Sequence, residues 1–178
     1  MTESQKQLIE YLEAVTTMRA AANLGHCAQP YHCIEDFVLQ RGRFFTPQQL
    51  PKGIKRGTER RCFENAGKLA ARRGASLVYV EGFALGEIPI HHAWVSDSLG
   101  NVYEVTWQTK DWTEDDITET SYFGVAFNAD FVLRVKTETK LWGVLDDVKR
   151  RWPVLRGIYQ PGEMLEPSLM SALERNAL

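Results

Sequence analysis

The sequence predicts an α+β fold, and two observations support this prediction. Apolar residues recur at helical spacing over residues 4–24, and this segment is followed by Gly25, a residue typical of helix C-terminal ends. Three later segments are rich in β-branched and aromatic residues, at residues 75–85, 88–96 and 101–107. Helices that precede and follow a consecutive run of strands are typical of α+β proteins.

The remaining elements follow from local signals along the chain. A second short helix is predicted over residues 34–40, and a loop rich in Pro and Gly covers residues 44–57. Thr58 is the predicted N-cap of a helix over residues 59–73, which places Cys62 in its first or second turn. The later predictions are a hairpin turn at 97–100, a short capped helix from Thr113, an interrupted strand over 122–135, and helices over 141–151 and 167–175.

Length and composition indicate a single globular domain. The chain has 178 residues, of which 44% are hydrophobic and 25% are charged, so it can bury a core and is not disordered in composition. We expect one domain over residues 1–178, with its core at 58–136. An N-terminal helical region is expected at 1–45, and C-terminal helices are expected over 141–178.

Charge and cysteine content restrict the expected partners and surroundings. The formal net charge of −2 gives no overall attraction to nucleic acid or to an anionic membrane, so neither is expected as a partner. The sequence has no apolar leader and no segment of membrane-spanning length, and its three cysteines do not suggest a disulfide framework. We therefore expect a cytoplasmic protein without a cofactor, and the sequence leaves the oligomeric state open.

Cys62 is the strongest candidate for a nucleophile. A cysteine attacks as its thiolate, which is stabilised by a helix N-terminus and by nearby cations. Cys62 lies near the start of its predicted helix and directly follows Arg60 and Arg61. Between Lys52 and Arg73 the chain carries eight Lys and Arg residues against two Glu residues. This basic stretch is either a solvated surface, a binding site for an anionic substrate or partner, or a means of stabilising the thiolate.

Two neighbouring predicted strands supply a base and a carboxylate. His92 lies in the segment 88–96 and Glu104 in the segment 101–107, and the turn at 97–100 places them opposite each other or one step apart. A carboxylate beside an imidazole orients the ring and stabilises its protonated form. The sequence therefore predicts a Cys-His-carboxylate triad, with the nucleophile on a helix and its two partners on adjacent strands.

Five short motifs together resemble a known superfamily. They are CFENA at residues 62–66, HAWV at 92–95, LGN at 99–101, YEVTW at 103–107 and YFG at 122–124. In this order they resemble transglutaminase-like proteins within the papain-like cysteine peptidase superfamily. The order of residues also has a looser similarity to that of arylamine N-acetyltransferases.

This resemblance implies both a fold and a set of roles. The implied fold is a papain-like or transglutaminase-like core, in which the nucleophile helix packs on an antiparallel sheet, with extra N- and C-terminal helices. The implied roles are Cys62 as nucleophile, His92 as base and Glu104 as orienter, at a position where the superfamily usually has Asp.

Four further residues are expected near this triad. Asn65 and Trp94 are candidate oxyanion donors in addition to the backbone N–H of Cys62. Trp107 and Tyr122 are candidates for substrate binding. An ordinary role in the core is the alternative for the aromatic residues.

A metal site is not expected. His26, Cys27, His32 and Cys33 offer four nitrogen and sulfur ligands within eight residues. However, the adjacent ligands in each His-Cys pair point in different directions, and the spacing matches no standard zinc motif.

Three functional hypotheses follow. The leading one is a cysteine-dependent acyl-transfer enzyme acting on a protein or peptide substrate, as an amide or peptide hydrolase, a deamidase or a transglutaminase-like enzyme. The alternative is a non-catalytic protein-interaction or inhibitor module on the same scaffold. The weakest is a metal-dependent hydrolase that uses the four His and Cys ligands.

Overall fold

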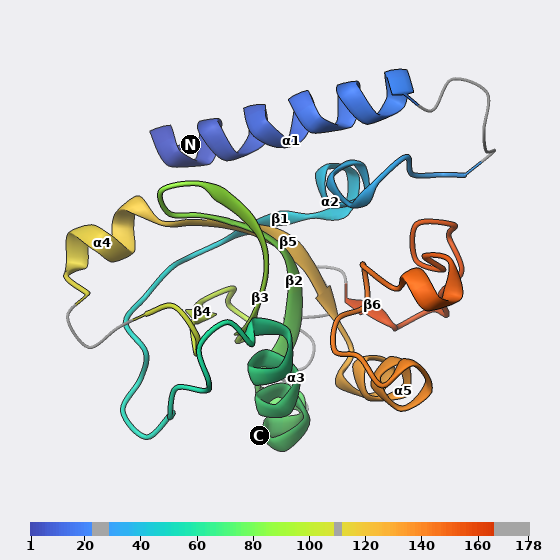
Figure 1. Ribbon diagram of the computed structural model, residues 1–178. Coiled ribbons are helices and arrows are strands. Elements are labelled where there is room, and N and C mark those ends of the chain that lie inside the picture. The colour runs from blue at the N-terminus through green and yellow to red at the C-terminus, as the bar shows by residue number, and fades with distance from the viewer. Residues whose placement is uncertain (23–28, 109–111, 166–178) are drawn as a thin grey trace.

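The computed structural model describes residues 1–22, 29–108 and 112–165 (Figure 1). The described α-helices are α1 (Glu3–Ala22), α2 (Ile34–Arg41), α3 (Cys62–Arg73), α4 (Glu114–Glu119) and α5 (Ala129–Thr139). The strands are β1 (Arg43–Phe45), β2 (Val78–Leu85), β3 (Pro89–Ser96), β4 (Val102–Tyr103), β5 (Ser121–Phe127) and β6 (Met164–Leu165). Two 3-10 turns, η1 (Gly74–Ser76) and η2 (Val148–Arg150), complete the elements. The predicted α+β class is therefore confirmed.

The strands form one antiparallel sheet with β2 at its centre. The strand order is β1-β5-β2-β3-β4, and β6 pairs with the end of β5. β2 pairs along its whole length with β3 on one side, and from Tyr79 to Leu85 with β5 on the other. The sheet thus brings β5, which is distant in the sequence, next to the hairpin of β2 and β3.

The sheet curls until its two edge strands meet. Thr46, directly after β1, forms an isolated parallel bridge with Asn101, directly before β4. The N–H of Val102 donates to the Thr46 carbonyl at 2.8 Å, and the N–H of Thr46 donates to the Gly100 carbonyl at 2.9 Å. Edge strands otherwise present unpaired backbone groups, so this contact satisfies part of both edges.

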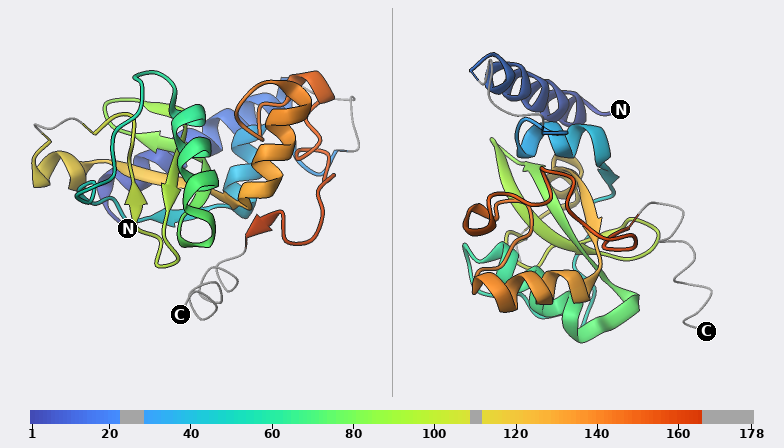
Figure 2. Two further views of the ribbon diagram at one scale, coloured as in Figure 1. Left: turned by 90° about the horizontal axis from the view of Figure 1, so that it is seen from below. Right: turned by 90° about the vertical axis from the view of Figure 1, so that its right-hand side faces the viewer.

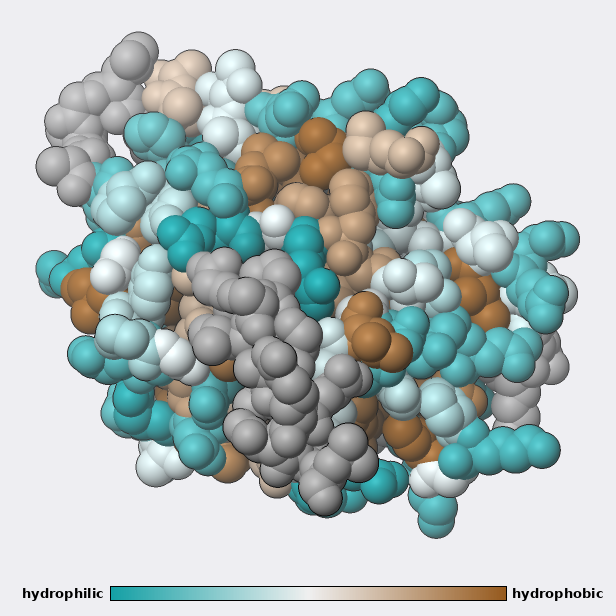
Figure 3. Space-filling view, turned by 180° about the vertical axis from the view of Figure 1, so that it is seen from behind, coloured by the Kyte–Doolittle hydropathy of each residue, from teal (hydrophilic) through white to brown (hydrophobic). Residues whose placement is uncertain are grey.

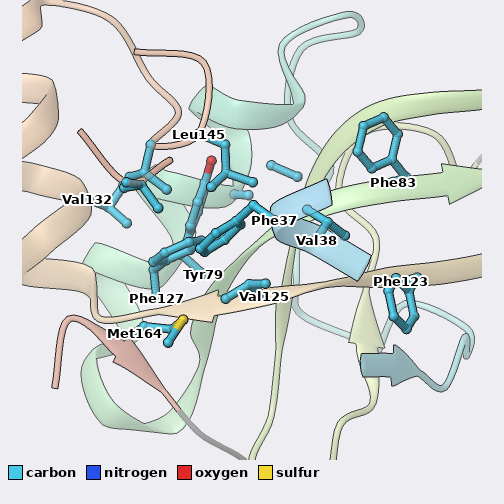
Figure 4. Close-up of a cluster of buried hydrophobic side chains, with 14 of the residues drawn as sticks. Phe37, Val38, Tyr79, Phe83, Phe123, Val125, Phe127, Val132, Leu145 and Met164 are labelled. Atoms are coloured by element: carbon cyan, nitrogen blue, oxygen red, sulfur yellow. The ribbon is translucent and has the colours of Figure 1, made fainter. Parts of the chain in front are cut away.

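Each face of the curled sheet has its own core because side chains alternate across a strand. The enclosed face carries a smaller cluster of buried apolar residues: Phe45, Val78, Val80, Ala84, Trp94, Val102, Tyr122 and Ala126. The opposite face carries a larger cluster, to which α1, α2, α3 and α5 all contribute; Figure 4 shows part of it, with Phe37, Tyr79 and Phe127 close together.

The helices cover the outer face of the sheet in two groups. α1 and α2 contact β2 and β5 on one side, whereas α3 and α5 lie at the other end, with α3 packed mainly on β3 (Figures 1 and 2). Leu8 and Leu12, one helical turn apart in α1, are fully buried. In α3 the buried residues Ala66, Gly67 and Ala70 are small, so this helix approaches β3 closely. That packing fixes where the N-terminus of α3 lies.

Two predicted elements in the second half of the chain are wrong. The strand expected over 122–135 ends at Phe127, because Asn128 accepts a hydrogen bond from the N–H of Asp130 and caps α5. The helix expected over 141–151 is replaced by irregular chain and the turn η2. The helix expected over 167–175 lies outside the described residues.

The physical reason for the missing helix at 141–151 is a competing set of hydrogen bonds. The N–H groups of Val144 and Leu145 donate to the buried carboxylate of Glu81, at 2.7 and 3.0 Å. Gly143 has a φ of +100°, a conformation that ends helical geometry and that glycine adopts readily. The backbone N–H groups of this segment therefore bond to a side chain of the sheet instead of forming helical hydrogen bonds.

The surface is mostly hydrophilic on the side shown in Figure 3, where apolar side chains occur in several separate areas. Within the described residues, none of the helices combines the length and apolar character that crossing a membrane requires.

Gly82 tests the close packing of the two central strands. A β-carbon there would lie 2.3 Å from the Phe123 carbonyl oxygen and 2.4 Å from the Cα of Gly124, both backbone atoms of β5. We expect Gly82→Ala to lower the free energy of unfolding by about 2 kcal/mol or more, because the ladder must shift. Gly86→Ala is the matched control, since no atom lies within 4 Å of its added carbon. Urea denaturation measures both, and equal midpoints for the two variants would contradict this packing.

Candidate active site

Cys62 is the first residue of α3 and is half-buried. The side chain of the N-cap residue, Arg61, does not cap the first-turn N–H groups of the helix. These groups and the helix dipole favour a negative charge at the Cys62 sulfur. Arg60, directly before the cap, has a φ of +60°, a conformation uncommon for residues other than glycine. The backbone thus turns sharply into the helix that presents the thiol.

The predicted N-cap, Thr58, is not the helix cap. The N–H of Thr58 donates to Oδ1 of Asn65 at 3.2 Å, and the Thr58 carbonyl accepts from Nδ2 of Asn65 at 2.7 Å. Asn65 therefore holds Thr58 against the side of α3, and the helix begins four residues later than Thr58. This correction places Cys62 at the first helical position.

His92 and Glu104 meet because β3 and β4 separate. The two strands pair only through Val95 with Tyr103 and Ser96 with Val102. Continued pairing would place Glu104 opposite Trp94, two residues along the strand from His92. Instead β4 ends at Tyr103, and Nε2 of His92 lies 2.7 Å from Oε2 of Glu104. The predicted neighbourhood of these two residues is confirmed, whereas the predicted strand over 101–107 is reduced to two residues.

Glu104 is buried and its carboxylate has four hydrogen-bonding partners. Oε1 accepts the backbone N–H groups of Thr106 and Trp107 at 2.6 and 2.9 Å. Oε2 accepts from His92 and, at 3.4 Å, from the hydroxyl of Tyr122. Burial by itself raises the pKa of this carboxyl, but the charge of His92 and the hydrogen bonds outweigh burial and lower the pKa. Glu104 therefore remains ionised beside the imidazole.

His92 is fully buried, and its ring is held in one orientation. The Trp107 ring stacks on it, with 4.2 Å between ring centroids and 23° between planes. Burial by itself lowers the pKa of His92, but the carboxylate of Glu104 and the neighbouring Cys62 raise that pKa to about 9. The pair is therefore an imidazolium and a carboxylate at neutral pH.

The second ring nitrogen of His92 is left for the thiol. Nε2 is occupied by Glu104, and Nδ1 is buried without a hydrogen-bond partner among the described residues. Cys62 lies close enough to His92 to raise the histidine pKa through hydrogen bonding and charge. The three predicted triad residues thus come together, and Nδ1 is the atom that can exchange a proton with sulfur.

The side chain of Asn65 is not available as an oxyanion donor. Its Nδ2 donates to the Thr58 carbonyl at 2.7 Å and to Oγ1 of Thr106 at 3.0 Å, so both amide hydrogens are used. Asn65 instead ties α3 to the segment that follows Glu104. The backbone N–H of Cys62 then remains as the candidate oxyanion donor.

The three aromatic candidates separate into two roles. Trp94 and Tyr122 are fully buried in the enclosed core, with 5.2 Å between their ring centroids, so neither can contact a substrate. Tyr122 acts on the site through its bond to Glu104. Trp107 is only half-buried and stacks on His92, so it is the one of the three that can both orient the base and reach a substrate.

A second buried network of hydrogen bonds, which was not predicted from the sequence, lies on the opposite face of β3. Glu81, at 0% exposure, accepts the Tyr79 hydroxyl at 2.7 Å as well as the two N–H groups of residues 144 and 145. Nε2 of His91 lies 3.2 Å from its Oε1, without hydrogen-bond alignment, and the His91 ring contacts Phe63 with 5.0 Å between centroids. A single carboxylate inside the apolar segment VYVEGFAL was the signal available for this network.

The potential metal ligands divide between described and undescribed residues. His26 and Cys27 lie outside the described residues. His32 and Cys33 lie at the start of α2, where the His32 N–H donates to Asp36 at 2.8 Å and Cys33 is buried. Burial raises the pKa of the Cys33 thiol, which makes it a poor nucleophile. Within the described residues, no group of three or more His, Cys, Asp or Glu could hold a metal ion.

Comparison with protein-family models, with curated proteins and with solved structures finds no match.

The charged pair predicts a pH dependence of stability. The pKa of His92 is raised from 6.5 to about 9, so its stabilising contribution is complete below pH 6.5 and is lost as the pH rises through about 9. The contribution of Glu104, whose pKa is lowered, is present above about pH 4.5 and is lost as the pH falls through that lower pKa.

We therefore expect the free energy of unfolding to fall between about pH 7 and pH 9 more steeply in the wild type than in Glu104→Gln, which lacks the charge that holds the proton on His92. Urea denaturation at both pH values measures the difference. Parallel curves for the two proteins would show that His92 is not protonated through Glu104.

The network around Glu81 predicts that removing this side chain strongly destabilises the fold. Glu81→Ala leaves the Tyr79 hydroxyl and two backbone N–H groups buried without an acceptor, so we expect a loss of about 3–5 kcal/mol in unfolding free energy. Glu119→Ala, at an exposed residue of α4, is the control and should change stability little. Thermal and urea unfolding report both, and a Glu81 variant as stable as the control would contradict the network.

Proposed function

We propose that this chain is a cysteine-dependent acyl-transfer enzyme, in which Cys62 is the nucleophile, His92 the base and Glu104 the residue that orients the base. The observation that carries the proposal is the buried 2.7 Å pair of His92 and Glu104, which leaves Nδ1 of the imidazole for the thiol at the start of α3. Amide or peptide hydrolysis, deamidation and transglutaminase-like transfer all use this arrangement.

The first half of the reaction acylates the enzyme. Before the attack the proton of Cys62 is already on Nδ1 of His92, which is an imidazolium, and the thiolate sulfur attacks the carbonyl carbon of an amide or ester. The backbone N–H of Cys62 stabilises the negative oxygen that develops on that carbonyl. The bond to the leaving group then breaks, and the imidazolium of His92 donates its proton to the departing amine or alcohol. A thioester with Cys62 and a neutral imidazole remain.

The second half resolves the thioester. Nδ1 of His92 removes a proton from water or from an incoming amine, which attacks the thioester carbonyl. The tetrahedral intermediate collapses with loss of the Cys62 sulfur, which leaves as the thiolate beside the imidazolium of His92, so the starting pair is restored. Water gives hydrolysis or deamidation, and an amine gives transfer. Glu104 keeps the ring orientation and stabilises the imidazolium in both halves.

The proposal extends to the core of the fold. A nucleophile at the start of a helix that packs on an antiparallel sheet, with the histidine on the adjacent strand, is the arrangement implied by the resemblance to transglutaminase-like proteins. The extent of α3, its packing on β3 and the position of Glu104 directly after β4 support that assignment. Protein or peptide substrates are proposed on the same basis.

The test is the pH dependence of alkylation of each cysteine by iodoacetamide, read by mass spectrometry. We expect Cys62 to react well below pH 8.5, where about half of a free thiol is ionised, and to react faster than buried Cys33. His92→Gln and Glu104→Gln should move the Cys62 profile to higher pH. His91→Gln, one residue away on the other face of β3, is the matched control and should leave the profile in place.

Two results would contradict the proposal. One is a Cys62 that reacts like a free thiol, and the other is a profile that does not depend on His92. Either result would favour the non-catalytic interaction or inhibitor module, for which the next measurement is the capture of a binding protein.

A further inference from the structure

We infer that the substrate of this site is a polypeptide with acidic residues next to the reacting carbonyl, bound by the exposed basic residues of the segment that contains Cys62. This inference rests on the proposed function and adds the chemical class of substrate to it. The basic surface is defined as the eight Lys and Arg residues of the segment from Lys52 to Arg73: Lys52, Lys55, Arg56, Arg60, Arg61, Lys68, Arg72 and Arg73.

The positive charge of the chain is concentrated in this segment. Its eight basic and two acidic residues give a net charge of +6, whereas the rest of the chain, with thirteen basic and twenty-one acidic residues, carries −8. All eight basic residues are exposed. An overall charge of −2 therefore hides a cationic surface on an otherwise acidic protein, which is a pattern that steers anionic ligands to one place.

Glu64, one of the two acidic residues of the segment, does not cancel the charge of this surface. Glu64 makes ion pairs with Arg61 and Lys68, at 3.0 and 2.6 Å, so one carboxylate is shared between two cations. Arg61, Glu64, Lys68 and Arg72 follow one another at spacings of three and four residues, which places them along one side of α3. The helix that begins with Cys62 thus carries a cationic ridge on its exposed side.

Hydrogen bonds hold the preceding loop beside the triad. A guanidinium nitrogen of Arg56 donates to the Gln108 carbonyl at 2.6 Å, and the N–H of Gly57 donates to the Val105 carbonyl at 2.8 Å. Oε1 of buried Gln108 accepts the N–H of Leu50 at 2.8 Å, and Ile54 packs on the main core. These contacts fix residues 50–57 against the segment that contains Glu104 and Trp107. The loop that carries Lys52, Lys55 and Arg56 is therefore held against the chain segment that contains Glu104, and Arg60 and Arg61 directly precede α3.

A polypeptide fits this surface better than a nucleic acid. Single-stranded nucleic acids need aromatic side chains on which bases stack, and Phe63 is the only aromatic residue in the segment from Lys52 to Arg73. The ring of Phe63 already contacts His91 within the fold. The adjacent chemistry is attack on an acyl carbon, which a polypeptide supplies in its backbone and side-chain amides.

The first experiment compares two alkylating reagents, one of which is neutral and one anionic. Iodoacetamide is neutral and reports whether Cys62 is an activated thiolate, whereas iodoacetate is anionic and also reports the local potential. We expect the iodoacetate-to-iodoacetamide rate ratio at Cys62 to exceed that of free cysteine at least about 3-fold at low salt. The excess should disappear near 0.5 M NaCl, where charges are screened within roughly 4–5 Å.

Charge reversal identifies the residues responsible. Lys55→Glu combined with Arg60→Glu changes one cation of the loop and one before α3, and we expect the ratio to fall about 3-fold or more. Arg19→Glu, an exposed residue of α1, is the matched control and should leave the ratio unchanged. Iodoacetamide labelling and far-ultraviolet circular dichroism of each variant verify that the thiol and the fold are retained.

The second experiment uses a decapeptide of alternating Glu and Gly residues, with alternating Gln and Gly as its neutral counterpart. We expect the acidic peptide to bind by fluorescence anisotropy at low salt and to slow alkylation of Cys62 by iodoacetamide. The neutral peptide should do neither. A single-stranded RNA with the same number of negative charges is the third ligand, and we expect it to bind more weakly than the acidic peptide.

The outcomes separate the two proposals. Fast iodoacetamide labelling with an ordinary iodoacetate ratio, or no difference between the two peptides, would overturn the acidic-substrate inference and leave the enzyme proposal standing. Slow labelling by both reagents would remove the enzyme proposal and this inference with it. Tighter binding of the RNA than of the acidic peptide would overturn the inference in favour of a nucleic-acid ligand.

Discussion

The buried pair of His92 and Glu104 is the interaction on which the arrangement of this site depends. Removing two charges from water is unfavourable unless each charge has close partners. Glu104 gains them from His92, from the Tyr122 hydroxyl and from two backbone N–H groups. To make these bonds the chain must leave the sheet after Tyr103, which shortens β4 to two residues. The pairing of β4 with β3 therefore stops at Tyr103, and the buried Glu104 carboxylate gains its hydrogen bonds instead.

A second buried carboxylate, that of Glu81 in β2, is satisfied in a similar way on the opposite face of the sheet. Glu81, like Glu104, accepts a tyrosine hydroxyl and two backbone N–H groups and lies beside a histidine. One carboxylate fixes the segment that follows β4, and the other fixes the irregular chain after α5. Because His91 and His92 are adjacent on β3, both networks bear on the same short piece of strand. Phe63, which contacts His91, links the second network to the start of α3.

The site is assembled from parts that are distant in sequence but tied together by polar contacts. Asn65 bonds α3 to Thr106, and Gly57 bonds the loop over residues 50–57 to Val105. The helix and the loop are therefore both held by the residues that directly follow Glu104. The small residues of α3 permit its close packing on β3. The start of α3, the loop over residues 50–57 and the segment that contains Glu104 are consequently held together by one connected set of contacts.

The sequence by itself determined the α+β class, the helices near residues 4–24 and 59–73, the hairpin after β3 and the pairing of His92 with Glu104, because each of these follows from local periodicity, turn residues or short-range strand register. Only the tertiary structure decided the closure of the sheet, the start of α3 at Cys62 and the irregular chain over 141–151. It also decided the true roles of Asn65 and Trp94. These depend on long-range hydrogen bonds, such as those of Asn65 with Thr58 and of Glu81 with residues 144 and 145. Because a buried polar group is satisfied by whatever partner the fold brings to it, its role cannot be deduced from the neighbouring residues in the chain.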